Sequence, residues 1–276
     1  MKQLNLGVFY KWQPYKKING TLFYCMEYYL QLKRNKKHII NFYIVDISDK
    51  DLKLVYKTFK DKYKDKYLKK LNIIQVKRTQ IRELNLDNTL VLDIKTFINI
   101  RLFCTNRIHV FCNNINDFND RKLFNYSFDK TRSVIYYGSY KKYQQYDKFN
   151  ILKLGLQFHK TYNNSKNKIF FSGADPKILE KYSSKHLESE VFTKQFNKTI
   201  DNLFEEISTI VYVHTSLDTN NRIIPEAKYH NKELRIINDT IEIDSIKYRF
   251  EDCFINNNLH KYIINDNDIM IKNMLN

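Results

Sequence analysis

Short apolar runs alternate with amphipathic stretches along the whole chain. The apolar runs are typical of buried β-strands, and the stretches between them carry apolar residues three or four positions apart, which predicts helices. In the first half the predicted strands are 4–10, 38–47, 72–77, 89–94 and 107–114, and the predicted helices are 21–37, 49–70 and 95–105. Strands that alternate with helices in this way favour a mostly parallel sheet.

The alternation starts again near residue 132. The second half has predicted strands at 132–140, 167–173, 188–192, 208–214 and 234–238, separated by predicted helices at about 146–160, 175–185, 197–207 and 223–231. We therefore expect an α/β fold with two Rossmann-like domains: an N-terminal domain over 1–128 and a C-terminal domain over 129–250. A helical tail, 251–276, could return to the first domain.

The segment 208–239 has the strongest pattern. An apolar run, STIVYVHT, is followed by the polar turn SLDTNN and then by RIIPEAKYHNKELRIIND, which predicts a strand, a loop, a helix and a second strand. Arg222 and Glu226 are four residues apart, so they share one face of the first helical turn. A cation for phosphate and a carboxylate for ribose hydroxyls would form a nucleotide clamp. The alternative is an ordinary surface salt bridge.

Composition narrows the class of partner. The 47 Lys and Arg residues against 30 Asp and Glu give a net charge of +17, which favours nucleic acid or an anionic membrane surface. A merely basic protein from an AT-rich genome is the alternative. Neither an 18-residue apolar run nor the apolar core of a signal peptide is present, and the four cysteines form no CxxC pair, so we expect a soluble cytoplasmic protein with reduced cysteines.

Gly138, Ser139 and Lys141 follow the predicted strand 132–140 and would place a hydroxyl, backbone N–H groups and a cation at a sheet edge. The spacing of a P-loop or of GxGxxG is absent, and an ordinary glycine turn is the alternative. The seven histidines form no HExxH motif and no cluster with cysteine, which gives a metal site little support. His214, at a strand end, would be either a phosphate contact or a packing residue.

The order of elements, with VIYYGSYKKYQQYDKF opening the second half and DTNNRIIPEAKYHNKELRIIND ending in a strand, resembles the two-Rossmann glycosyltransferases called GT-B. Within that class the chain is most similar to the phage DNA β-glucosyltransferases. The resemblance implies UDP-glucose as donor and a hydroxymethylated base in double-stranded DNA as acceptor. It also implies that Ser139, Lys141 and Gln145 hold the diphosphate, although Gln145 stands where the family has a basic residue.

The same resemblance assigns Arg222 and Glu226 to diphosphate and ribose, although three residues separate them here and two in the phage enzymes. It places the nucleobase near Glu190 and Val191. The form RIIPEA is closer to the general GT-B pattern than to the phage subfamily, so the class is better supported than the subfamily.

LVLDIKTF, residues 90–97, is similar to the family's strand that ends in the catalytic Asp. Asp93 would take the proton from the acceptor hydroxyl as it attacks the anomeric carbon, with inversion. An Asp after a strand is also a common N-cap, and Asp46 competes for the same role.

Contacts to DNA phosphates would come from five basic residues that flank the proposed acceptor side, namely Lys11, Lys16, Lys17, Lys95 and Arg101. The mechanism requires neither a tightly bound cofactor nor a divalent metal. We expect a monomer that acts in the cytoplasm, which is the host cytoplasm if a phage encodes the protein. Two alternatives remain: a GT-B enzyme that acts on a cell-surface glycan or lipid-linked acceptor, and a non-catalytic DNA-binding protein.

Overall fold

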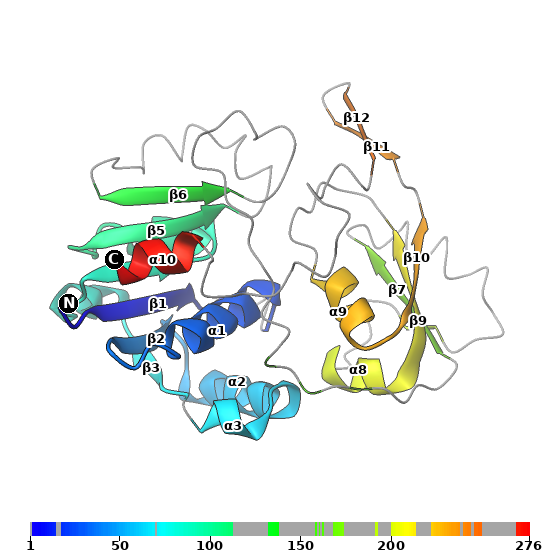
Figure 1. Ribbon diagram of the computed structural model, residues 1–276, viewed down its shortest axis with the longest axis horizontal. Helices are drawn as coiled ribbons and strands as arrows, with labels where there is room; N and C mark the ends of the chain where they lie inside the picture. Colours follow the sequence, from blue (N-terminus) through cyan, green and yellow to red (C-terminus); the bar gives the residue numbers. More distant parts are fainter. Residues whose placement is uncertain are drawn as a thin grey trace. The chain divides into compact units, whose positions relative to one another are not determined.

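The computed structural model describes residues 2–14, 18–69, 71–112, 132–137, 158, 160, 162, 168–173, 191–192, 200–213, 222–237, 240–243, 246–249 and 269–276. The described residues belong to two compact units (Figure 1). The first holds the residues up to Phe158 together with the C-terminal helix, and the second holds those from Lys160 to Arg249. Each unit has its own parallel β-sheet.

The sheet of the first unit has six parallel strands in the order β3-β2-β1-β4-β5-β6. The strands are β1 (Asn5–Lys11), β2 (Ile39–Val45), β3 (Ile73–Val76), β4 (Asn88–Val91), β5 (Arg107–Cys112) and β6 (Ser133–Tyr137). This is the order of a Rossmann fold, in which the chain reverses direction across the sheet between β1 and β4. Ligands of open α/β sheets bind beyond the carboxyl ends of the strands at such a switch point.

The helices of the first unit are α1 (Gly20–Leu32), α2 (Asp49–Lys62), α3 (Asp65–Leu68), the 3₁₀ helix η1 (Arg78–Glu83), α4 (Ile94–Ile100) and α10 (Ile269–Leu275). Helices cover both faces of the sheet. Phe9 and Val91 pack with Phe97 of α4 on one face. Tyr43 of β2 stacks on Phe9, so its neighbour Phe42 points to the opposite face, where its ring stacks on Tyr29 of α1 with ring centroids 5.9 Å apart.

One long helix was expected over 49–70, and the structure has two. The backbone of Tyr63 is extended between α2 and α3. Its side chain is buried and its hydroxyl donates to Glu27 Oε1 at 2.9 Å, while the backbone N–H of Lys64 donates to the carbonyl of Phe158. These contacts with distant segments break a pattern that is locally helical.

The strand expected to open the second domain belongs instead to the first unit. β6 pairs in parallel with β5, so that Ile135 lies opposite Val110. The described residues therefore continue the first sheet beyond residue 128, the boundary that the alternation predicted. The apolar pattern of a strand does not specify its sheet, because the pairing partner is remote in sequence.

The C-terminal helix α10 packs on the first unit through Met270, Ile271 and Met274, which are buried. Asn88 in β4 donates a hydrogen bond to the carbonyl of Met274 at 3.1 Å, and Asn273 donates to the hydroxyl of Tyr136 at 2.9 Å. These polar contacts join the end of the chain to β4 and β6.

The second unit has a parallel sheet whose described strands run in the order β10-β9-β7-β8. Its elements are β7 (Lys168–Gly173), β8 (Val191–Phe192), α8 (Ile200–Glu206), β9 (Ile207–Val213), α9 (Ile223–Tyr229) and β10 (Glu233–Ile237), followed by the antiparallel hairpin β11 (Thr240–Ile243) and β12 (Ile246–Arg249). Among these strands the order reverses between β7 and β9, which makes their carboxyl ends the second switch point. The predicted class, α/β with two Rossmann-like domains, is confirmed.

Candidate functional site

Asp93 lies two residues beyond β4, at the switch point of the first sheet. It is the N-cap of α4: its Oδ1 accepts the backbone N–H of Thr96 at 2.7 Å, and its Oδ2 accepts the Thr96 hydroxyl at 2.7 Å. The Thr96 hydroxyl oxygen in turn accepts the backbone N–H of Lys11 at 3.0 Å. One hydrogen-bonded chain thus connects the carboxyl ends of β1 and β4.

Burial raises the pKa of the Asp93 carboxyl above its ordinary value, because only 8% of the residue is exposed. The hydrogen bonds from Thr96 oppose the shift without cancelling it. Since a carboxylate offers about four lone-pair sites, the two bonds from Thr96 leave it able to accept another proton donor. A carboxyl with a raised pKa suits a general base that works near neutral pH.

Asp46, the competing carboxylate, is held differently. It follows β2 with a positive φ of 54°, and its Oδ2 lies 3.1 Å from Lys11 Nζ and 2.9 Å from Arg78 Nε. Partial burial alone would raise the pKa of Asp46, but the hydrogen bonds and positive charges of Lys11 and Arg78 outweigh it and lower the pKa. A carboxylate stabilised by two cations is a poorer proton acceptor than Asp93.

The basic residues expected near Asp93 do not all gather there. Lys11 is engaged with Asp46, and Lys95 is exposed in the first turn of α4. Arg101 lies at the far end of α4, about 12 Å along the helix axis from Asp93, where its guanidinium contacts the carbonyl of Ile98. Lys16 and Lys17 lie outside the described residues.

Sequence reasoning missed Gln13 at the same edge of the sheet. It follows β1 by two positions, is 8% exposed, and its Oε1 has no hydrogen-bond partner among the residues that the structure describes. A buried amide oxygen without a donor costs free energy, so it is a natural acceptor for a ligand group. Only its position directly after a strand could have indicated it.

The predicted pair in the second unit is formed. Arg222 is the N-cap residue of α9, and its Nε donates to Glu226 Oε1 at 2.7 Å. The two residues form the i,i+4 ion pair that the alternative expected, but with 9% and 2% of the side chains exposed the pair is buried and does not lie at the surface. Burying an ion pair removes two charges from water, and this desolvation free energy can exceed the electrostatic attraction between them. The pair is therefore weakly explained by a contribution to stability alone.

The pair follows the central strand of its sheet. β9, α9 and β10 form the expected strand, helix and strand, with β10 parallel to β9. On its other side β9 pairs with β7, and the last pair is Gly173 opposite Val213. Because the strand order reverses between β7 and β9, the carboxyl end of β9 lies at the switch point. Because α9 connects the parallel strands β9 and β10, its first residues, next to Arg222, lie toward the carboxyl ends of these strands.

Of the other predicted nucleotide contacts, the structure describes Val191. Ser139, Lys141, Gln145, Glu190 and His214 lie outside the described residues. Val191 begins β8, where its backbone pairs with Ile169 of β7.

The described ranges contain neither a cluster of metal ligands nor a helix that could span a membrane. No three His, Cys, Asp or Glu side chains there gather as metal ligands. Among the described helices, none combines the length and apolar character needed to span a bilayer.

No protein-family model and no curated protein matches the sequence. Solved structures with similar folds include MurG of Acinetobacter baumannii (TM-score 0.44, 9% identity, 82% of this chain and 76% of that one). Others are a protein described as a UDP-N-acetylglucosamine 2-epimerase from Listeria monocytogenes (0.48, 9%, 87% and 80%) and the calicheamicin glycosyltransferase CalG4 (0.36, 10%, 100% and 95%). TM-scores below 0.5 at about a tenth identity do not assign the chain to a family.

Proposed function

We propose that this protein is a glycosyltransferase of the GT-B kind that takes a sugar from a nucleotide donor, UDP-glucose in the first instance. The observation that carries the proposal is the buried pair of Arg222 and Glu226 after β9. Its support is physical: an ion pair that is costly to bury lies where α/β sheets bind ligands, and its two groups suit diphosphate and ribose.

The roles within the pair follow from its chemistry. The Glu226 carboxylate would accept hydrogen bonds from the two ribose hydroxyls, which are donors of the right spacing. Arg222 donates to Glu226 through Nε, and the planar fork of N–H groups in a guanidinium matches the oxygens of a phosphate. Positive charge there would stabilise the UDP leaving group as the glycosidic bond breaks. Ser139, Lys141 and Gln145 would complete the diphosphate site, with Glu190 and Val191 near the base.

Asp93 is the proposed general base. An acceptor hydroxyl would attack the anomeric carbon from the side opposite UDP and give its proton to the Asp93 carboxylate, while the electron pair of the broken bond leaves on the diphosphate. The configuration at that carbon would invert. The unpartnered Gln13 Oε1, at the same edge of the sheet, supports a ligand site there.

The acceptor proposed is a hydroxymethylated base in duplex DNA, which would have to swing out of the helix before it reacts. The net charge of +17 supports a polyanionic acceptor. The proposed contacts to the DNA phosphates are Lys11, Lys16, Lys17, Lys95 and Arg101.

The test measures UDP release from UDP-glucose in the presence of hydroxymethylated duplex, unmodified duplex or a lipid-linked hydroxyl acceptor. We expect release that depends on the hydroxymethylated duplex and that is lost in Glu226→Gln. Release only with the lipid-linked acceptor would replace DNA while keeping the donor. Duplex binding without release from any nucleotide sugar would leave a non-catalytic DNA-binding protein.

A further inference from the structure

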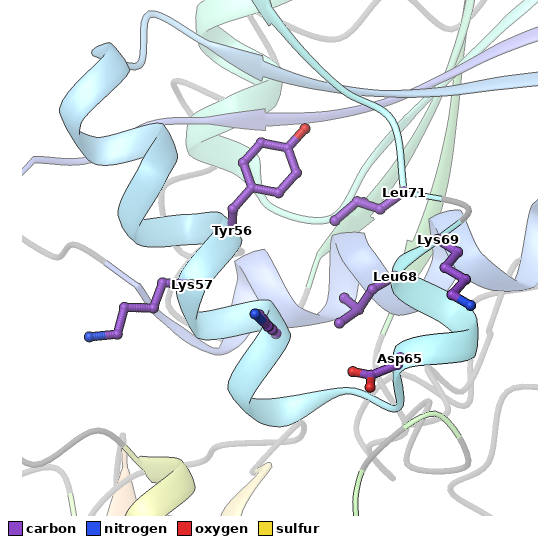
Figure 2. A pocket seen from close by; sticks show the side chains of 7 residues that line it. Tyr56, Lys57, Asp65, Leu68, Lys69 and Leu71 are labelled. Atoms are coloured by element: carbon purple, nitrogen blue, oxygen red, sulfur yellow. The ribbon is translucent and has the colours of Figure 1, made fainter.

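A lysine-rimmed groove lies between α2 and α3 of the first unit. Its cavity of about 360 Å³ is lined by Tyr56, Lys57, Lys60, Asp65, Leu68, Lys69 and Leu71. In Figure 2, Tyr56, Leu68 and Leu71 project into the space between the two helices, whereas Lys57 and Lys69 extend outward at its margins. The groove thus has an apolar floor, and its charged lining consists of three lysines and one aspartate, Asp65.

The core of the unit does not explain this surface. The inner face of α2 carries Val55, Phe59 and Lys62, and it is buried, with the ring of Phe59 6.0 Å from that of Phe23 in α1. The groove residues of α2, Tyr56, Lys57 and Lys60, lie on its other side, and Tyr56 is 40% exposed. Large apolar side chains that remain exposed beside lysines are typical of an interaction surface.

Charge indicates the kind of partner. The segment 49–71 has nine lysines and four aspartates, a net charge of +5. Lys57 and Lys69 are exposed and form no ion pair with any carboxylate among the described residues. A cluster of this kind attracts phosphate groups.

We propose that this groove docks the protein on an anionic membrane surface. Lysines at the rim would meet lipid phosphates, and Tyr56, Leu68 and Leu71 would contact the glycerol and upper acyl region, as tyrosine and leucine do at bilayer interfaces. A nucleic-acid backbone is the poorer fit, because its phosphates are hydrated and gain nothing from a floor of two leucines.

Docking is independent of the proposed transfer. Leu71 leads into the amino end of β3, so the groove lies toward the amino edge of the sheet, while Asp93 follows the carboxyl end of β4. Failure of one proposal would therefore leave the other standing.

The test is co-sedimentation of the full chain with vesicles of phosphatidylcholine alone or with phosphatidylglycerol. Two triple variants are compared: Lys57→Glu, Lys60→Glu and Lys69→Glu in the groove, and Lys36→Glu, Lys37→Glu and Lys247→Glu at exposed positions elsewhere. Each Lys→Glu exchange removes two charges from +17, so both variants carry +11. Only the position of the charges differs.

We expect wild type to bind the vesicles that contain phosphatidylglycerol and not those of phosphatidylcholine alone. The affinity for the anionic vesicles should fall roughly 100-fold in the groove variant and far less in the matched control. A third variant, Leu68→Gln with Leu71→Gln, keeps the charge and should still lose affinity. Equal loss in both triple variants, or no vesicle binding by wild type, would overturn the proposal. So would a groove variant that loses affinity for a duplex DNA probe and keeps it for vesicles. Thermal melting and UDP binding of each variant verify that it is folded.

Discussion

The hydroxyl of Thr96 donates to Asp93 Oδ2 at 2.7 Å, and the backbone N–H of Thr96 donates to Oδ1 of the same carboxylate. Asp93 is thus both the N-cap that starts α4 and a buried carboxylate at the switch point of the first sheet. The two roles do not exclude each other. The cap fixes the orientation of the carboxylate, and burial raises its pKa.

Asp93→Asn separates the two roles. Asparagine caps helices about as well as aspartate, so we expect the unfolding free energy to change by less than about 1 kcal/mol. It cannot accept a proton from the acceptor, so kcat should fall by a factor on the order of 10² to 10⁴ while UDP affinity is kept. Asp46→Asn is the control and should retain transfer activity. Full activity in Asp93→Asn would show that another group is the base.

The raised pKa of Asp93 also predicts a dependence of stability on pH. A carboxyl whose folded pKa lies above its unfolded value of 3.8 stabilises the fold in its protonated form, and this contribution is lost as pH rises through the folded pKa. The unfolding free energy of wild type minus that of Asp93→Asn should therefore fall as pH rises above 3.8. Urea denaturation of both proteins from pH 4 to 8 measures the difference. A difference that is constant over this range would contradict the raised pKa.

Among the described residues, local patterns predicted most of the strands and helices of the two sheets, and prediction failed where long-range pairing decides the structure. The unit formed by β9, α9 and β10 was predictable because its apolar run, turn and helix are contiguous in sequence. The sheet to which β6 belongs was not, since only its pairing with β5 decides it. Likewise, the spacing of apolar residues predicts one helix through Tyr63, but the hydroxyl of Tyr63 donates a hydrogen bond to the buried Glu27 and the helix is interrupted there. In the candidate site, the spacing of Arg222 and Glu226 predicted that they could pair on one helix face, but nothing in the sequence predicted that the pair is buried.

His109 predicts a second dependence on pH. The ring is fully buried in β5, and its Nδ1 lies at hydrogen-bonding distance, 2.9 Å, from the Tyr136 hydroxyl. Burial, with a smaller contribution from the charge of Arg107, lowers the pKa of His109 from 6.5 to about 4. A histidine with a depressed pKa stabilises the fold above pH 6.5, and this stability is lost as pH falls toward 4. The loss should approach about 3 kcal/mol.

Urea denaturation of wild type and His109→Gln at pH 7.5 and 5.0 tests this expectation. Glutamine does not titrate, so the variant should lose less of its stability on acidification than wild type does. Parallel losses in both proteins would show that His109 does not titrate in this range.

Tyr63→Phe should destabilise the first unit. The change removes the 2.9 Å hydrogen bond to Glu27, whose side chain is completely buried, and the expected cost is about 1 to 3 kcal/mol of unfolding free energy. Tyr56→Phe removes a hydroxyl from an exposed residue and should change stability by less than about 0.5 kcal/mol. Denaturant unfolding of both variants makes the comparison. Equal stabilities would mean that the Tyr63 bond does not hold the end of α2.

The most direct test of the central claim is a thermal-shift titration of the full chain with UDP and 2′-deoxy-UDP. A ligand that binds only the folded protein raises the melting temperature, by several degrees at concentrations near 100 times its Kd. We expect UDP to stabilise wild type more strongly than 2′-deoxy-UDP, because Glu226 would accept both ribose hydroxyls. In Glu226→Gln, UDP affinity should fall by about 10- to 100-fold.

Glu206→Gln is the matched control, because Glu206 forms a half-buried 3.1 Å ion pair with Lys168 in the same unit, at the amino edge of its sheet. It should keep the affinity of wild type for UDP. Stabilisation of wild type by UDP that is lost in Glu226→Gln and kept in Glu206→Gln is the predicted result. No response of wild type to UDP or UDP-glucose, or equal affinity in both variants, would contradict the nucleotide site.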